Sequence, residues 1–216
     1  MNKGDKKKQQ KALSKGSERK RSSGRQGLST RAGLPRHIRE ARSYPIAGCW
    51  TAQGWEEHGL AVVVVARRQP NGNLVSGTYL VDRYCLGLKN TYCDADMPED
   101  EFRQEYLPAV VGDSELTSIS PALAHEIIYG GIAYAARFGF RPHPDFARSR
   151  HVLDPEEAHP HIGAVEFGYD EGKPLYVAGP YDNAEAVLRQ LSRTAGEGNY
   201  DYVLMFPDPP SVEWEE

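Results

Sequence analysis

The four consecutive valines within Leu60–Gln69 constrain the fold more than any other feature of the sequence. β-Branched residues that are apolar at successive positions favour a strand that is covered on both faces. Pro70–Asn73 follows with an Asn-Gly pair, which supplies the positive φ angles of a tight turn, and Leu74–Leu88 again has the pattern of a strand. We therefore predict an antiparallel hairpin from Leu60 to Leu88 at the centre of a sheet.

The segment Pro121–Phe138 has the pattern of a buried helix. Ser120 is a suitable N-cap, a proline at the first helical position is favourable, and Gly139 suits the position after the last turn. Apolar residues cover most of its circumference, so we expect more than one neighbour to bury it. Gly130–Gly131 in its middle costs about 1 kcal/mol per residue relative to Ala, which indicates the close approach of another backbone or of a ligand.

The remaining pattern completes an α+β fold. Further strands are predicted at Tyr44–Ala52, Ala164–Tyr169, Pro174–Gly179 and Tyr200–Phe206, and further helices within Cys93–Gly112 and Ala184–Gly196. Gly87 and the polar residues after it indicate that the return strand of the hairpin breaks there, with Lys89 in a loop. We expect a mixed, mainly antiparallel sheet with a central buried helix and a disordered basic N-terminal arm.

Charge divides the chain into two unequal parts. Residues 1–43 contain seven Lys and seven Arg against three acidic residues, a formal charge of +11, so residues 44–216 carry −15 of the total of −4. This division predicts a basic arm and linker at 1–43, followed by a single acidic α+β domain at 44–216. Two parts of opposite charge have different electrostatic partners.

The basic arm has the composition of a nucleic-acid-binding segment. Residues 1–33 contain almost no apolar side chains, so we expect them to be disordered in isolation and to contact RNA or DNA through phosphates. The predicted contact residues are Lys6, Lys7, Lys8, Lys11, Arg19, Lys20 and Arg21. Because residues 1–43 contain no Phe, Trp or Tyr, binding there should not depend on base sequence. The alternatives are a solvated tail, a localisation signal, or an arm that folds back onto the acidic domain.

The cysteines and the hydropathy pattern predict a cytoplasmic protein without a membrane partner. Cys49, Cys85 and Cys93 form no CxxC pair, which argues against a disulfide framework or a zinc ribbon and favours a reducing compartment. No stretch approaches 18 apolar residues, the length that a membrane-spanning helix needs.

Five side chains are candidates for a catalytic site. His125 and Glu126 are neighbours on the predicted central helix, and Asp82 lies among apolar residues on the return strand of the hairpin. His143 and Asp145 follow in a proline-rich loop, at a spacing that lets two side chains lie on one side of an extended segment. Imidazole and carboxylate groups serve in acid–base catalysis, so a His/Glu/Asp site is one hypothesis.

Each candidate also has a structural interpretation. The zinc motif HExxH is absent, because Tyr129 stands where the second histidine would be. His125 can be a hydrogen-bonded core histidine, Glu126 can pair with a nearby arginine, and Asp82 can pair with a neighbouring lysine or arginine.

A divalent metal ion is a candidate cofactor. His159 and His161 repeat the alternate spacing of the pair in the loop, and a mixture of His, Asp and Glu ligands suits zinc, manganese or iron. The order of strands and helices also resembles the layout of ribonuclease-H-like domains. That resemblance implies a magnesium site of clustered carboxylates, for which Asp82 and Glu126 are the candidates, although the first predicted strand (PIAGCW) lacks the aspartate usual in that fold.

Three functional hypotheses follow from these patterns. The first is a nucleic-acid-associated cytoplasmic protein whose basic arm tethers an acidic globular domain. The second is a small hydrolase, with or without a metal ion, that uses the His/Glu/Asp site. The third is a non-enzymatic module that binds a protein partner, which we would favour if no pocket lies near Gly130–Gly131.

Overall fold

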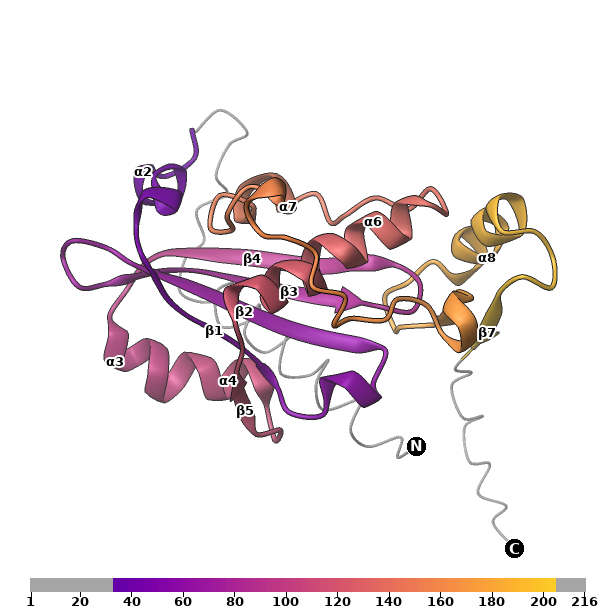
Figure 1. Ribbon diagram of the computed structural model, residues 1–216, viewed down its shortest axis with the longest axis horizontal. Helices are drawn as coiled ribbons and strands as arrows, with labels where there is room; N and C mark the ends of the chain where they lie inside the picture. The colour runs from indigo at the N-terminus through magenta and orange to yellow at the C-terminus, as the bar shows by residue number, and fades with distance from the viewer. Residues whose placement is uncertain (1–32, 205–216) are drawn as a thin grey trace, which may run out of the picture.

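The computed structural model describes residues 33–204 and has the α+β fold that the sequence predicts (Figure 1). Five strands form an antiparallel sheet in the order β4-β3-β2-β1-β5. They are β1 (Ile46–Ala52), β2 (Leu60–Arg68), β3 (Leu74–Asp82), β4 (Gly87–Met97) and β5 (Leu116–Ser118). The first four strands are consecutive both in the chain and in the sheet, so each is joined to the next by a short turn.

The predicted hairpin is confirmed, but its return strand is shorter than expected. β2 pairs with β3 along its whole length, from Leu60 opposite Asp82 to Arg68 opposite Leu74. The prediction of a loop at Lys89 is wrong, because β3 ends at Asp82 and β4 pairs with it from Gly87 onward. Gly87 has a φ of 65°, a left-handed conformation that lets the chain turn back at this point.

Each face of the sheet packs against its own helices, as the alternation of side chains along β2 requires. Val63 and Val65 belong to the core beneath α5 (Pro121–His125), the π-helical turn η4 (Glu126–Gly130) and α6 (Gly131–Ala136). The same face also holds α2 (Arg36–Arg39), the 3₁₀ turn η1 (Ala41–Ser43) and α7 (Phe146–Ser149). Val62 and Val64 face a second core under α3 (Glu99–Glu101), η3 (Phe102–Tyr106) and α4 (Leu107–Val111) (Figure 1).

The central helix begins at Pro121, as the sequence predicts, and ends at Ala136, two residues before the predicted Phe138. The Ser120 hydroxyl accepts a hydrogen bond from the Leu123 backbone N–H at 3.1 Å, and Gly139 adopts a φ of 79° after the last turn. A close approach is also present at Gly130–Gly131, but it is made chiefly by side chains and not by the predicted backbone or ligand. A Cβ added to Gly130 would meet the ring of Phe167, and one added to Gly131 would lie 2.5 Å from Val81 Cγ1. Protein side chains therefore fill the space beside both glycines.

The C-terminal part of the described chain adds a second, smaller sheet. It contains β6 (Leu175–Val177), α8 (Ala184–Thr194) and β7 (Asp201–Val203), and β6 pairs in parallel with β7. The strand predicted at Ala164–Tyr169 is absent, so this prediction is wrong. Side chains and a turn hold this segment instead of a ladder: the Val165 N–H donates to the Glu126 carboxylate, and the Gly168 N–H donates to the carbonyl of Arg83.

The segment Leu153–Phe167, called here the strap, crosses the central helix between α7 and the small sheet (Figure 1). Apart from the 3₁₀ turn η5 (Glu156–Ala158) it has no regular structure. None of the helices within residues 33–204 combines the length and the apolar character that a membrane span requires.

Candidate functional site

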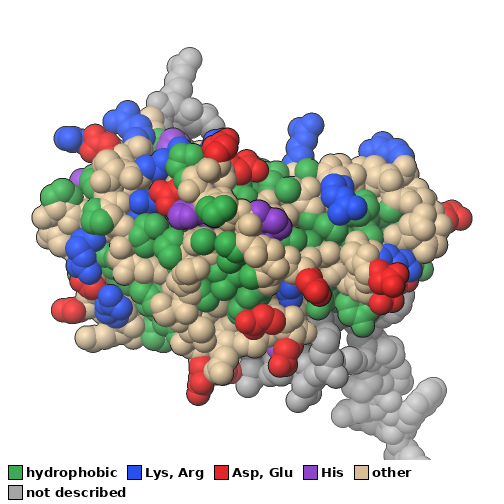
Figure 2. Space-filling view, viewed as in Figure 1, with side chains coloured by type: hydrophobic (Ala, Val, Ile, Leu, Met, Phe, Trp, Pro, Cys, Tyr) green, Lys and Arg blue, Asp and Glu red, His purple; other side chains and the backbone are tan. Residues whose placement is uncertain are grey.

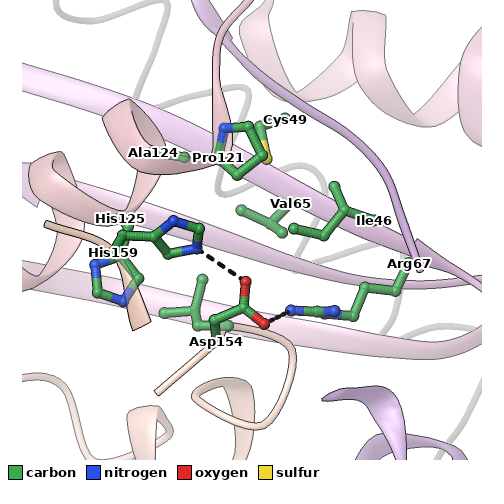
Figure 3. Close-up of a pocket in the computed structure, with 10 residues that line it drawn as sticks. Ile46, Cys49, Val65, Arg67, Pro121, Ala124, His125, Asp154 and His159 are labelled. Atoms are coloured by element: carbon green, nitrogen blue, oxygen red, sulfur yellow. Dashed lines mark hydrogen bonds and ion pairs between the residues drawn. The ribbon is translucent and has the colours of Figure 1, made fainter. Parts of the chain in front are cut away.

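A small pocket lies between the sheet, the first turn of the central helix and the strap (Figure 3). Its volume is about 10 Å³, which is room for roughly one water molecule. The lining residues come from β1, β2, α5 and the strap: Ile46, Cys49, Val65, Arg67, Pro121, Ala124, His125, Leu153, Asp154 and His159. Half of them are apolar, and the other half carry a thiol, an imidazole, a carboxylate or a guanidinium. This density of reactive groups makes the pocket the candidate functional site.

An ion pair between Arg67 and Asp154 closes one side of the pocket. Arg67 is 3% exposed, and a buried guanidinium is tolerated only when its N–H groups have acceptors. It donates to the carbonyls of Val152 at 2.6 Å and Tyr44 at 2.8 Å, and to the Asp154 carboxylate. Partial burial opposes ionisation of Asp154, but the hydrogen bonds from His159 and Arg67 outweigh it and hold the pKa of this carboxyl below its usual value. Asp154 is therefore a fixed, ionised group.

Two histidines complete the polar side of the pocket. The Nε2 atom of His159 lies 2.9 Å from Asp154 Oδ2, so this nitrogen carries the proton that the carboxylate accepts. The His125 ring lies 4.9 Å from the His159 ring, and its Nε2 donates to the carbonyl of Pro155 at 2.9 Å. Burial, and secondarily the neighbouring His159, lower the pKa of His125, which favours the neutral imidazole. Asp154 and His159 have the geometry of a carboxylate that orients an imidazole for acid–base work.

The Cys49 side chain faces the same pocket as a neutral thiol. It is 2% exposed, and this burial raises the pKa of the thiol to about 12, even though Arg67 acts in the opposite direction. A nucleophilic cysteine needs a lowered pKa and access to solvent. Cys49 has neither in this arrangement, so it serves as an apolar wall.

The pocket contains the donor types that zinc prefers but not their arrangement. Asp154 is already engaged by the guanidinium of Arg67, and a cation placed beside it would meet this positive charge. Throughout residues 33–204, no group of three or more His, Cys, Asp or Glu side chains is placed to hold a metal ion. The described geometry therefore gives no support to a metal-dependent reaction at this pocket.

Glu126, next to His125 on the helix, binds the strap. Its two carboxylate oxygens accept the backbone N–H groups of Ile162 at 3.1 Å and Val165 at 3.3 Å, and His161 Nδ1 lies 3.1 Å from Oε1. The Glu126 side chain is 2% exposed. His125 and Glu126 therefore bind the strap at two points. Glu126 binds its C-terminal half, and His125 binds the carbonyl of Pro155 near its N-terminal end.

Asp82 lies away from the pocket, in the turn between β3 and β4. Its Oδ1 atom accepts the backbone N–H groups of Tyr84 and Cys85, both at 3.0 Å, which is the bonding of a turn-forming aspartate. Burial raises the pKa of Asp82 to about 6, although Lys89 and backbone N–H groups act in the opposite direction. Among the hydrogen bonds described, those of Asp82 organise the turn.

The raised pKa of Asp82 predicts a pH-dependent stability. The folded protein binds a proton at about pH 6, whereas the unfolded chain binds it near 3.8. Protonation of Asp82 therefore stabilises the folded state relative to the unfolded chain, by about 2–3 kcal/mol. This contribution is fully present below pH 3.8 and is lost as the pH rises through 6. Asp82→Asn keeps the acceptor oxygen without the charge, so the variant should be more stable than the wild type at pH 7 and equal to it near pH 4. Urea unfolding of both proteins between these values measures the difference, and a constant difference would contradict the prediction.

His143 and Asp145 lie on the surface near α7, and neither lines the pocket. The His143 N–H donates to the carbonyl of Leu88 at 3.0 Å, and its Nδ1 accepts the Asp145 N–H at 3.2 Å. The ring and the Asp145 carboxylate are 4.0 Å apart at their nearest atoms. Of the five predicted catalytic residues, the structure therefore places only His125 in the pocket.

Sequence reasoning missed Arg67 and Asp154 as members of the site. Arg67 follows Val63 and Val65 on the same face of β2, so the alternation of side chains along the strand could have predicted its burial. Asp154 gives no such signal, because its partner Arg67 lies 87 positions away in the sequence. His159 was recognised only as a candidate metal ligand, through its spacing from His161.

The predicted nucleic-acid-binding residues Lys6, Lys7, Lys8, Lys11, Arg19, Lys20 and Arg21 lie outside the described residues. Comparisons of the chain with protein-family models, with curated proteins and with solved structures gave no match.

Proposed function

We propose that this protein associates with nucleic acid in the cytoplasm, and that its basic N-terminal residues tether an acidic body to RNA or DNA. The supporting observation is the division of charge, +11 for residues 1–43 and −15 for residues 44–216. Every cation that neutralises a phosphate releases condensed counterions, so a segment of this composition binds polyanions tightly at low salt. The acidic body repels the same polyanion, which concentrates the contact on the basic residues.

The cysteines support the cytoplasmic part of the proposal. Cys49 and Cys85 are buried thiols rather than members of disulfides. Such thiols persist in reducing compartments, where glutathione and thioredoxin maintain them.

Neutralising the arm tests the proposal in the full-length protein. Replacement of Lys6, Lys7, Lys8, Lys11, Arg19, Lys20 and Arg21 by Gln should weaken binding to both RNA and DNA. The plot of log affinity against log salt should become shallower by about 0.9 for each phosphate that the arm no longer neutralises, up to about 6 in total for duplex DNA. Fluorescence anisotropy with labelled oligonucleotides across a salt series measures both quantities.

A reordered arm is the matched control for this experiment. A variant with residues 2–32 in shuffled order keeps the charge and the length, and should bind like the wild type because phosphate contacts carry no sequence information. Equal affinity and equal salt slope for the wild type and the neutralised variant would refute the proposal.

A small hydrolase is the second candidate function, and the Asp154–His159 pair is the observation that favours it. In this form of the hypothesis His159 would be the general base, with Asp154 and Arg67 as the groups that orient it. The carboxylates of Glu126 and Asp82, which the sequence predicted to be catalytic, instead accept hydrogen bonds from backbone N–H groups. A pocket of about 10 Å³ admits water but no organic substrate without movement of the strap, so we rank this function below nucleic-acid association.

A further inference from the structure

Four exposed arginines lie on the face of the sheet that also carries the central helix. Arg39 and Arg42 belong to α2 and η1, the first elements of the described chain, and Arg148 and Arg150 belong to α7 and the residue that follows it. Both α2 and α7 pack against β4. We call these four residues the arginine patch. Its location matters because the basic N-terminal segment joins the body here.

The first two arginines face solvent because the opposite side of their segment is anchored in the core. Ile38 is 2% exposed and Ala41 is fully buried beneath the same helices. Arg39 and Arg42 alternate with these anchors and are exposed. The positive charges of this segment therefore lie on a fixed surface.

Hydrogen bonds from Arg42 connect the two halves of the patch. Its Nε donates to the carbonyl of Leu153 at 2.7 Å, and its Nη2 donates to the carbonyl of Arg150 at 3.1 Å. These bonds join residues more than 100 positions apart in the chain and bring the guanidinium of Arg42 to the C-terminal end of α7.

The electrostatic environment is consistent with a concentration of positive charge. Burial, followed by the nearby Arg42 and Arg150, lowers the pKa of His151. The same two arginines act to lower the pKa of the Tyr129 hydroxyl, although burial dominates there and raises it. Glu156 and Glu157 act in the opposite direction to the arginines and raise the pKa of this hydroxyl.

The patch arginines lack acidic partners within the described part of the chain. In residues 33–204, no carboxylate lies within ion-pair distance of a patch arginine, although Glu40, between Arg39 and Arg42 in the sequence, pairs with Arg36. Arginines elsewhere that pair with carboxylates include Arg67, Arg68, Arg103 and Arg189. Figure 2 shows Lys and Arg side chains at the upper left with acidic side chains among them, and several Asp and Glu side chains along the lower edge. Within residues 33–204 the four patch arginines have no carboxylate partner, although Arg42 donates to two backbone carbonyls, and this leaves their charges available to an external polyanion.

The aromatic side chains beside the patch, such as Tyr44, Tyr129 and Phe146, are half-buried, and this bears on the form of nucleic acid that the patch can bind. Proteins bind single strands largely by stacking bases on aromatic side chains. Among residues 33–204, the large aromatic side chains that are well exposed are Tyr169, Tyr181 and Tyr202, and they belong to the C-terminal part, at the other end of the molecule from α2 (Figure 1). We propose that the arginine patch binds the phosphate backbone of a nucleic-acid duplex and extends the contact of the basic arm onto the body. This inference rests on the proposed function and adds to it a surface and a class of ligand.

A triple substitution in the full-length protein tests the patch. Arg39→Gln, Arg148→Gln and Arg150→Gln remove three exposed charges and leave Arg42 with its structural hydrogen bonds. For a 20-base-pair DNA duplex, the slope of log affinity against log salt should become shallower by about 2–3 units, at about 0.9 per phosphate. The matched control is Arg137→Gln, Arg189→Gln and Arg193→Gln, which changes the net charge equally at exposed positions, one directly after α6 and two on α8, and should leave the slope unchanged. Replacement of the same three patch arginines by Lys should preserve the wild-type slope of log affinity against log salt.

The outcomes separate this inference from the proposed function. If the wild type binds neither duplex nor single strands in a salt-dependent manner, the proposed function fails. If the wild type binds and the neutralised arm abolishes binding, but the patch variant keeps the wild-type slope, only the patch is refuted. A steeper salt dependence for a single strand of equal length would also overturn the assignment to a duplex. The same holds if the patch variant loses binding only to vesicles of anionic phospholipid.

Discussion

Arg83→Ala is expected to lower the free energy of unfolding by about 3–5 kcal/mol, because this side chain joins four backbone carbonyls in the interior. Arg83 is 4% exposed. Its guanidinium donates to the carbonyls of Glu166 at 3.0 Å, Trp55 at 3.2 Å, Glu56 at 2.8 Å and His58 at 2.9 Å. The substitution would remove this donor from the carbonyls of Glu166, Glu56 and His58, whereas the Trp55 carbonyl would keep the backbone N–H of His58 at 3.3 Å. Urea unfolding monitored by tryptophan fluorescence measures the loss.

Two further variants identify which contacts of Arg83 are responsible. Its guanidinium carbon lies 5.0 Å from the Trp55 ring and 5.5 Å from the Tyr84 ring. Arg137 has similar ring contacts, at 5.4 Å from Tyr134, but it is exposed, so Arg137→Ala should cost no more than about 1 kcal/mol. Arg83→Lys should lose most of the stability that Arg83→Ala loses, because one ammonium group cannot reach acceptors on several sides. A Lys variant as stable as the wild type would contradict this explanation.

Glu126→Ala is expected to destabilise the fold by about 2–4 kcal/mol and to release the middle of the strap. The substitution removes the acceptors of the Ile162 and Val165 N–H groups. In hydrogen exchange, these two amides should lose protection more than the amides of β2. Glu126→Gln should lose about half as much stability, because its amide retains one acceptor oxygen for the two N–H groups.

Glu185→Ala is the matched control for Glu126. Glu185 is exposed on α8 and pairs with Arg189 one turn away, so its removal should cost less than about 0.5 kcal/mol. Unchanged protection of Ile162 and Val165 in Glu126→Ala would show that the carboxylate does not hold the strap.

The sequence was most informative where one local pattern determined the structure. The valines of β2 predicted a strand buried on both faces, and Ser120 predicted the first residue of the central helix. The sequence was least informative where backbone N–H groups bind side chains or turns instead of a neighbouring strand. The segment Ala164–Tyr169 alternates like a strand, yet its backbone N–H groups bind Glu126 and the carbonyl of Arg83. An alternating pattern shows which side chains are buried, but not which acceptors the backbone will find.

The candidate site could be predicted only in part, because local patterns do not show long-range contacts. Gly130–Gly131 correctly indicated a close approach, but the neighbours, Phe167 of the strap and Val81 of β3, are distant in the sequence. His125 was identified from its place on an apolar helix. Its surroundings depend on Asp154 and Arg67, which meet only when the strap docks. Contacts of this range cannot be inferred from spacing along one element.

The consecutive order of β1 to β4 has a consequence for the order of folding. Neighbouring strands joined by short turns require little loop-closure entropy, so this meander forms from local contacts. The strap instead depends on partners such as Arg67, 87 positions away, and it docks only onto a sheet and helix that already exist. We therefore expect the meander to form early and to be the most protected unit in hydrogen exchange. The strap, and the pocket that it closes, should form late and open first in the native state.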